Sequence, residues 1–209
     1  MLIEIYSDTV CPWCRIGKKN LADALSRWSG EEVELRPRAF LLDGTTPEQG
    51  LPFREYMSRK IGRSEQELDQ VFDQVTRAGA QSGLTFDFSK VKVYPNTRLS
   101  HRLILGVPEN KQMELFDRVM QAYFEEGRDI GDVEILLDIA EEAGLDREAV
   151  RKTLSDTALN ARIDADLSTA RQLGIRGVPF FVMDGRYALS GAQPAEAFLQ
   201  ALEQAAQKE

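Results

Sequence analysis

The chain has only two cysteines, and both lie in the stretch Cys11-Pro12-Trp13-Cys14. This stretch follows an apolar run at residues 2–6, which predicts a buried strand, and it begins a helical pattern of apolar residues. Two cysteines three residues apart at the start of a helix share one face and can form a disulfide. The unpaired N–H groups and the macrodipole of a helix N-terminus stabilise a thiolate, the reactive form of cysteine. The feature therefore predicts a strand-to-helix junction that carries redox chemistry.

Composition and charge limit the partners that we expect for this chain. Its 209 residues are 43% hydrophobic and 29% charged, which is typical of a globular protein with a full core. A net charge of -8 without a run of Lys or Arg argues against nucleic acid as a partner. Residues 1–4 show no signal-peptide pattern, and no apolar stretch is long enough to span a membrane. We therefore expect a cytoplasmic protein, in which paired cysteines are more often catalytic than structural.

The first three quarters of the chain change from mixed to helical character. Residues 1–40 predict a strand, the helix that contains Cys14, and a second strand at 32–40. From 47 to about 156 nearly every segment is helical, with starts marked by a Ser64/Glu67 capping box, Pro108, Asp132 and Asp146. The pattern predicts a block made of helices alone.

The end of the chain returns to mixed character. A helix at 159–173 precedes two strands joined by Asp184-Gly185, a strong hairpin signal, and Pro194 begins a last helix. The parts before and after the helical block are each incomplete alone, so the block is typical of an insertion. We predict an α/β domain made of residues 1–44 and 157–209, with a helical insertion domain at 45–156.

A distant motif, Gly177-Val178-Pro179, directly precedes the predicted hairpin. Together with the strand-CPWC-helix start and the helical block, it resembles the DsbA-like branch of the thioredoxin superfamily. Within that branch the chain is most similar to the FrnE-like proteins, which are related to 2-hydroxychromene-2-carboxylate isomerases and kappa-class glutathione transferases. The resemblance covers the whole chain and implies an α/β thioredoxin fold with a large all-helical insertion. It also implies a cis Val178–Pro179 bond that faces the cysteines and whose neighbouring backbone pairs with an extended substrate. The simpler alternative is a turn before an edge strand.

The two cysteines have distinct expected roles in a thiol–disulfide oxidoreductase. Cys11, which we expect to be exposed at the junction, is the candidate nucleophile, and Cys14 is the candidate resolving thiol. The expected substrates are proteins or small molecules that carry a disulfide or a dithiol, with no metal or organic cofactor and with glutathione as a candidate co-substrate. The alternatives are buried apolar cysteines or half of a zinc site. Zinc needs about four ligands, and His101 is the only histidine.

The dipeptide between the cysteines, Pro12-Trp13, is expected to tune the redox couple and to contact substrate. Pro12 suits the first helical position because its missing N–H would have no partner there. Trp13 cannot supply the positive charge that an imidazolium would provide, so we expect a less oxidising couple than that of the periplasmic oxidant DsbA. Trp13 is equally consistent with a place in the core.

Three polar residues form a weaker set of candidates. Asn96 is a plausible N-cap of the helix that contains His101. The resemblance implies that Asn96 and His101 line the cleft between the subdomains, whereas the simpler interpretation is a cap and a partly exposed histidine. Asp8 could accept protons near Cys11, although loop carboxylates are usually solvated.

Two rival functions stay open at this stage. One is a glutathione-dependent isomerase or transferase on the same scaffold, although those relatives usually have a serine in place of the first cysteine. The other is a non-enzymatic holdase that binds unfolded chains in the cleft. The sequence does not choose between a monomer and a homodimer.

Overall fold

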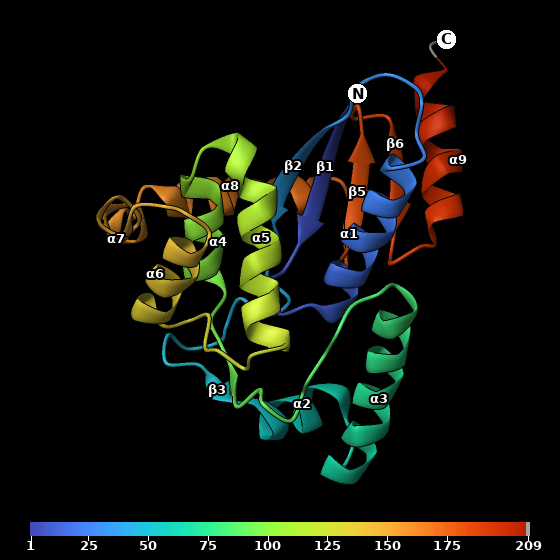
Figure 1. The fold of residues 1–209 in the computed structure, drawn as a ribbon. Helices are drawn as coiled ribbons and strands as arrows, with labels where there is room; N and C mark the ends of the chain where they lie inside the picture. Colours follow the sequence, from blue (N-terminus) through green and yellow to red (C-terminus); the bar gives the residue numbers. More distant parts are fainter. Residues whose placement is uncertain (208–209) are drawn as a thin grey trace.

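A four-stranded mixed sheet forms the centre of the computed structural model, which describes residues 1–207 (Figure 1). Its strand order is β2 (Glu34–Ala39), β1 (Leu2–Ser7), β5 (Phe180–Met183) and β6 (Tyr187–Ser190). β1 pairs in parallel with β2 and antiparallel with β5, and β5 pairs antiparallel with β6. The two halves of the sheet come from opposite ends of the chain, so the four-stranded sheet forms only when both ends are present.

Helices cover both faces of the sheet because its strands alternate their buried side chains. Ile3, Ile5 and Phe181 pack with α1 (Pro12–Leu25) and α9 (Ala195–Ala206), which lie side by side in Figure 1. Tyr6 and Val182 pack in a second cluster with Ala170 of α8 (Leu159–Gln172). The result is the predicted α/β thioredoxin architecture.

The segment between β2 and α8 is mainly helical, as expected. It contains α2 (Phe53–Ile61), α3 (Glu65–Gln81), α4 (Arg98–Gly106), α5 (Glu109–Phe124), α6 (Val133–Glu142) and α7 (Arg147–Ser155). The predicted caps at Ser64, Asp132 and Asp146 are confirmed, since each side chain accepts hydrogen bonds from the first turn of its helix. The sequence analysis missed a short antiparallel pair in this segment, β3 (Leu51–Pro52) with β4 (Val93–Tyr94).

The boundaries proposed at 44/45 and 156/157 stay predictions, and residues 208–209 of the last segment lie outside the described residues. The packing nevertheless joins the helices to the cysteines. The largest apolar cluster contains Cys11, Cys14 and several aromatic side chains from the inserted segment. Among these, the rings of Phe72 and Phe88 stack with their centres 4.6 Å apart. The thiols therefore lie where the helical core meets the start of α1. In the described chain, no helix is long and apolar enough to cross a bilayer.

Candidate active site

The two cysteines lie at the start of α1, directly after the loop that follows β1. Cys11 is the N-cap, with an extended backbone, and Pro12 is the first helical residue. The Cys11 N–H donates to the Asp8 carbonyl at 3.0 Å, and the Cys14 N–H donates to the Cys11 carbonyl at 3.0 Å. Both side chains are free thiols. The expected exposure of Cys11 is wrong, because this residue is only 4% exposed and Cys14 is fully buried.

The Val178–Pro179 peptide bond is cis, in agreement with the resemblance. The Val178 carbonyl accepts a hydrogen bond from the Cys11 thiol at 3.7 Å, so this loop faces the nucleophile candidate. Gly17 of α1 allows the close approach, since a Cβ there would lie 2.8 Å from Cγ of Pro179. The Val178 carbonyl oxygen and the Cys11 thiol are thus in contact, although they belong to segments that are far apart in the sequence.

Cys11 opens onto an apolar pocket of about 250 Å³ between the start of α1 and helices α2 and α3. Trp13 lines this pocket and is 39% exposed, which excludes a place in the core. Pro12 and Val178 also line it, together with Val10, Leu42, Phe53, Met57, Lys60, Ile61, Val71, Phe72, Val75, Phe88, Tyr94 and Phe124. The pocket can therefore hold an apolar group directly beside the Cys11 sulfur.

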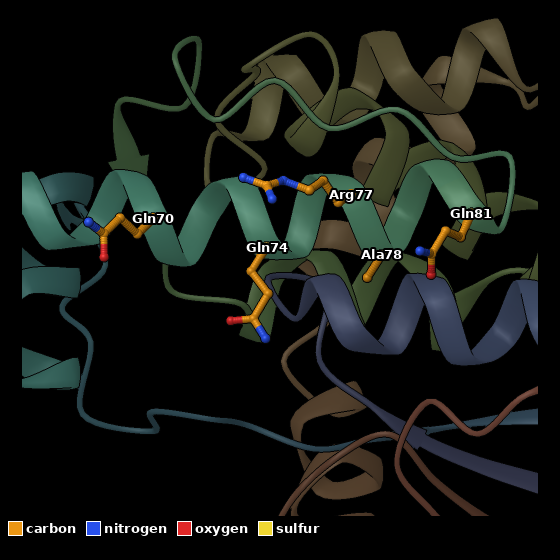
Figure 2. A pocket seen from close by; sticks show the side chains of 5 residues that line it. All are labelled: Gln70, Gln74, Arg77, Ala78 and Gln81. Atoms are coloured by element: carbon orange, nitrogen blue, oxygen red, sulfur yellow. The ribbon is translucent and has the colours of Figure 1, made fainter.

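A second hollow runs along α3 beside α1 and is lined by Gln70, Gln74, Arg77, Ala78 and Gln81 (Figure 2). It offers amide and guanidinium groups but no thiol, carboxylate or other nucleophile. We therefore assign the reactive site to the pocket at Cys11.

Asp8 and His101 form a buried pair behind the cysteines. Asp8 is 1% exposed and His101 is 3% exposed, so the expectation of a solvated carboxylate and a partly exposed histidine is wrong. Asp8 Oδ1 lies 3.4 Å from His101 Nε2, and Asp8 Oδ2 accepts from the Leu42 N–H at 2.7 Å. Neither Oδ1 nor Nε2 has a hydrogen-bond partner with good geometry within residues 1–207. The burial arises because α4 packs behind the strand-to-helix junction, where the hydroxyls of Thr9 and Ser100 also meet at 2.8 Å.

Asn96 lies elsewhere and has a different role from the one expected. The N-cap of α4 is Thr97, one residue later than predicted, and Asn96 Oδ1 accepts from the Arg98 N–H at 3.0 Å. Its amide nitrogen donates to the Thr46 carbonyl at 2.6 Å. Asn96 thus connects α4 to the loop after β2, and neither it nor His101 lines the pocket at Cys11. His101 approaches the cysteines through its 3.4 Å contact with Asp8.

Burial raises the pKa of the Cys14 thiol well above its usual value. The hydrogen bond with Cys11 and the negative charges of Cys11 and Asp8 raise it further, while a backbone hydrogen bond with Asp8 opposes them. Cys14 therefore keeps its proton at neutral pH, and any reaction as a nucleophile requires a nearby proton acceptor.

Sequence reasoning missed two cations near the cysteines. Lys60 lines the pocket from the last turn of α2. Arg15, the residue after Cys14, is buried, pairs with Glu125 and donates to the Thr85 carbonyl at 2.7 Å. The spacing of Tyr56 and Lys60 places both on one helix face. However, no pattern in the neighbouring sequence indicates that this helix face lies against the pocket at Cys11.

Comparison with known proteins identifies the class. The family described as DSBA-like thioredoxin domain matches residues 2–203. A crystal structure of a probable DsbA oxidoreductase from Streptomyces coelicolor is 36% identical, with a TM-score of 0.92 over 100% of this chain and 91% of that chain. The uncharacterized protein YwbO of Bacillus subtilis is 29% identical over 96% of this chain and 94% of its own length.

A more distant likeness shows the same fold. The cytosolic disulfide reductase DsbM of Pseudomonas aeruginosa, which has also been solved with GSH, is 22% identical, with a TM-score of 0.68 and 98% coverage of both chains. The family match spans nearly the whole chain. The protein belongs to the DsbA-like thioredoxin family, as the sequence predicts, and is similar to a probable DsbA oxidoreductase.

Proposed function

We propose that this protein is a thiol–disulfide oxidoreductase in which Cys11 attacks the substrate and Cys14 releases it. One observation carries the proposal: Cys11 caps α1, opens onto the apolar pocket and faces the Val178 carbonyl, with Cys14 buried behind it. Cys11 lies at the N-terminus of α1, the positive end of the helix dipole. The family match and the 36% identical probable oxidoreductase support the same class of reaction.

The reaction consists of two thiol–disulfide exchanges. First, the Cys11 thiolate attacks one sulfur of the substrate disulfide, forms a mixed disulfide and releases the other substrate sulfur as a thiolate. Cys14 then loses its proton and attacks the Cys11 sulfur, which forms the Cys11–Cys14 disulfide and releases the remaining substrate sulfur. Two electrons pass from the dithiol to the substrate, and the reverse sequence oxidises a substrate dithiol.

The second exchange requires a proton acceptor for Cys14, and we assign this role to the Asp8–His101 pair. Transfer of a proton from the Cys14 thiol to the Asp8 carboxylate leaves the number of buried charges unchanged. It also removes the negative charge that raises the pKa of Cys14. General-base help of this kind is typically worth about 10²–10⁴-fold in rate.

Replacing Asp8 with asparagine is expected to slow the release of substrate from the mixed disulfide by about 10²-fold at pH 7. The defect should shrink as the pH rises, because the pKa of Cys14 is raised and hydroxide then forms its thiolate without help. Stopped-flow measurement of thiol release gives this rate. Asp73→Asn, on the exposed side of α3, is the matched control. Equal rates for Asp8→Asn and wild type at pH 7 would remove Asp8 from the proposed reaction.

Trapping the mixed disulfide tests the proposed function. Reduced Cys14→Ser protein mixed with insulin should form a stable adduct, because the first exchange proceeds and the resolving thiol is missing. Mass spectrometry should locate this adduct on Cys11, and the wild type should instead release reduced insulin chains. Absence of both the adduct and the reduction by wild type would reject the oxidoreductase proposal.

We propose glutathione as the co-substrate: one glutathione thiolate attacks Cys11 and frees Cys14, and a second attacks the mixed disulfide, which restores the Cys11 thiol and releases oxidised glutathione. The support for this proposal is that DsbM, which shares the fold, has been solved with GSH. The less oxidising couple expected from Trp13 stays a prediction, as do the cytoplasmic location and the choice between monomer and homodimer.

A further inference from the structure

The ammonium group of Lys60 is held at the pocket by three oxygens and two aromatic rings. Nζ donates to the hydroxyl of Tyr56 at 2.9 Å, to the Leu42 carbonyl at 3.2 Å and to the hydroxyl of Tyr94 at 3.4 Å. It also lies 5.2 Å from each of the two tyrosine ring centres, within the range of cation–π attraction. A flexible surface lysine normally lacks such a fixed position, so the structure orients this charge.

The donors and acceptors in the hydrogen bonds around Lys60 can be assigned. The Tyr56 hydroxyl donates to Asp43 Oδ2 at 2.5 Å, which leaves its own oxygen free to accept from Lys60. Burial and the hydrogen bond to Asp43 raise the pKa of Tyr56, so this hydroxyl keeps its proton. Asp43 itself accepts from the N–H and the hydroxyl of Thr45. The network therefore fixes the last turn of α2 against the loop after β2.

Lys60 is the only Lys, Arg or His among the residues that line the pocket containing Cys11. The remaining lining is aliphatic or aromatic, apart from Cys11 and the tyrosine hydroxyl, so the two charges interact in a medium of lower polarity than water. Burial lowers the pKa of Lys60, and the negative charges of Asp43, Asp8 and Cys11 oppose this change. A cation and an ionised thiol that line the same apolar pocket attract each other more strongly than they would in water.

We propose that Lys60, held by Tyr56 and Tyr94, is the cation that stabilises the Cys11 thiolate from across the pocket. The residues between the two cysteines, Pro12 and Trp13, carry no positive charge. The inserted segment therefore provides from α2 an electrostatic contribution that the CPWC stretch lacks. This inference rests on the proposed function, because it assigns Cys11 as the attacking thiolate.

A test of Lys60 must separate its effect from those of the other titratable groups nearby. They are Tyr56 from α2, Tyr94 from β4, Asp43 from the loop after β2, and Asp8 and Cys11 from the strand-to-helix junction. From α3 the pocket receives only Val71, Phe72 and Val75, none of which titrates. Lys60 is thus the single positive group in this set, and replacing it isolates the effect of a positive charge.

The experiment measures the alkylation rate of Cys11 by iodoacetamide from pH 5 to 10 in a Cys14→Ser background, where Cys11 is the only thiol. Lys60→Met and Lys60→Gln should both lower the rate at pH 7 by about three- to tenfold, a shift of about half to one pH unit in the midpoint. The rates should converge with the parent at high pH, where the thiol is ionised in every variant. Lys60→Arg should stay within about twofold of the parent because it keeps the charge.

Two controls make the result specific. Lys152→Met removes the same charge from exposed α7, does not alter the pocket, and should leave the curve unchanged. Lys60→Gln keeps a hydrogen-bond donor for Tyr56 but removes the charge. If Lys60→Gln had the alkylation rate of the parent and Lys60→Met did not, the role of Lys60 would be to hold α2 against the loop by hydrogen bonds. A loss seen with the anion iodoacetate but not with neutral iodoacetamide would show that Lys60 recognises anions instead. Either result overturns the proposal, as does an unchanged curve for Lys60→Met.

The alkylation assay requires no disulfide substrate, so its outcome is independent of the trapping experiment. A shifted curve together with no trapped adduct would leave the role of Lys60 intact and reject the exchange reaction. The opposite pair of results would keep the exchange reaction and reject the role of Lys60. Thermal melting of each variant shows whether it is folded, and Lys60→Gln replaces Lys60→Met if the methionine variant is not.

Discussion

Replacing Cys11 with serine is expected to lower the turnover of insulin disulfides by on the order of 10³-fold or more. A serine hydroxyl is not ionised at neutral pH and cannot form a mixed disulfide, so the first exchange does not start. Turnover is measured as the precipitation of reduced insulin chains, with glutathione as the reductant. The substitution changes one atom at a buried N-cap, so we expect the fold of α1 to persist.

Cys14→Ser is the matched comparison, because it also replaces one sulfur in the same motif. This variant should keep the first exchange and lose the second, which gives a single burst of released thiol followed by little turnover. Cys11→Ser should give neither burst nor turnover. Wild-type turnover in Cys11→Ser would show that the reduction of insulin occurs without this thiol and would contradict the assignment of the nucleophile.

The parts of the fold that could be predicted from the sequence are those determined by residues close to one another along the chain. The strand and helix around Cys11 follow from hydrophobic periodicity, and the starts of α3, α6 and α7 follow from side chains that cap their first turns. The cis bond before Pro179 was expected from the resemblance and is present. For the strand, the helix and the caps, the pattern and its physical cause lie within a few residues of each other.

The burial of Asp8 could not be predicted in this way. Asp8 follows β1 in a loop, where carboxylates are usually solvated, but α4 brings His101 to 3.4 Å from it and the loop after β2 donates the Leu42 N–H to it. These residues are almost a hundred positions apart, as are Thr9 and Ser100, whose hydroxyls meet beside them. The periodicity of α4 predicts a helix but not the element against which the helix packs.

Lys60 and Arg15 illustrate the same limit for charged residues. Each lies on a helix whose sequence allows a solvated face, and each is placed by partners from distant segments. Arg15 is 9% exposed because Phe86 and Glu125 of the inserted segment cover it. The polar surroundings of the cysteines are therefore a product of how the inserted helices pack, and the motif itself specifies only the thiols and the helix start.

Replacing Leu21 with alanine is expected to lower the free energy of unfolding by about 2–5 kcal/mol. Leu21 is fully buried, and it packs from α1 into the cluster that contains Phe181 of β5 and Phe198 of α9, so alanine leaves a cavity beneath the helix that carries both cysteines. Urea unfolding followed by tryptophan fluorescence measures the change. Leu173→Ala is the matched control, since Leu173 is 53% exposed and its loss should change stability by no more than about 0.5 kcal/mol. An equal effect of the two substitutions would contradict the packing of α1 against the sheet and α9.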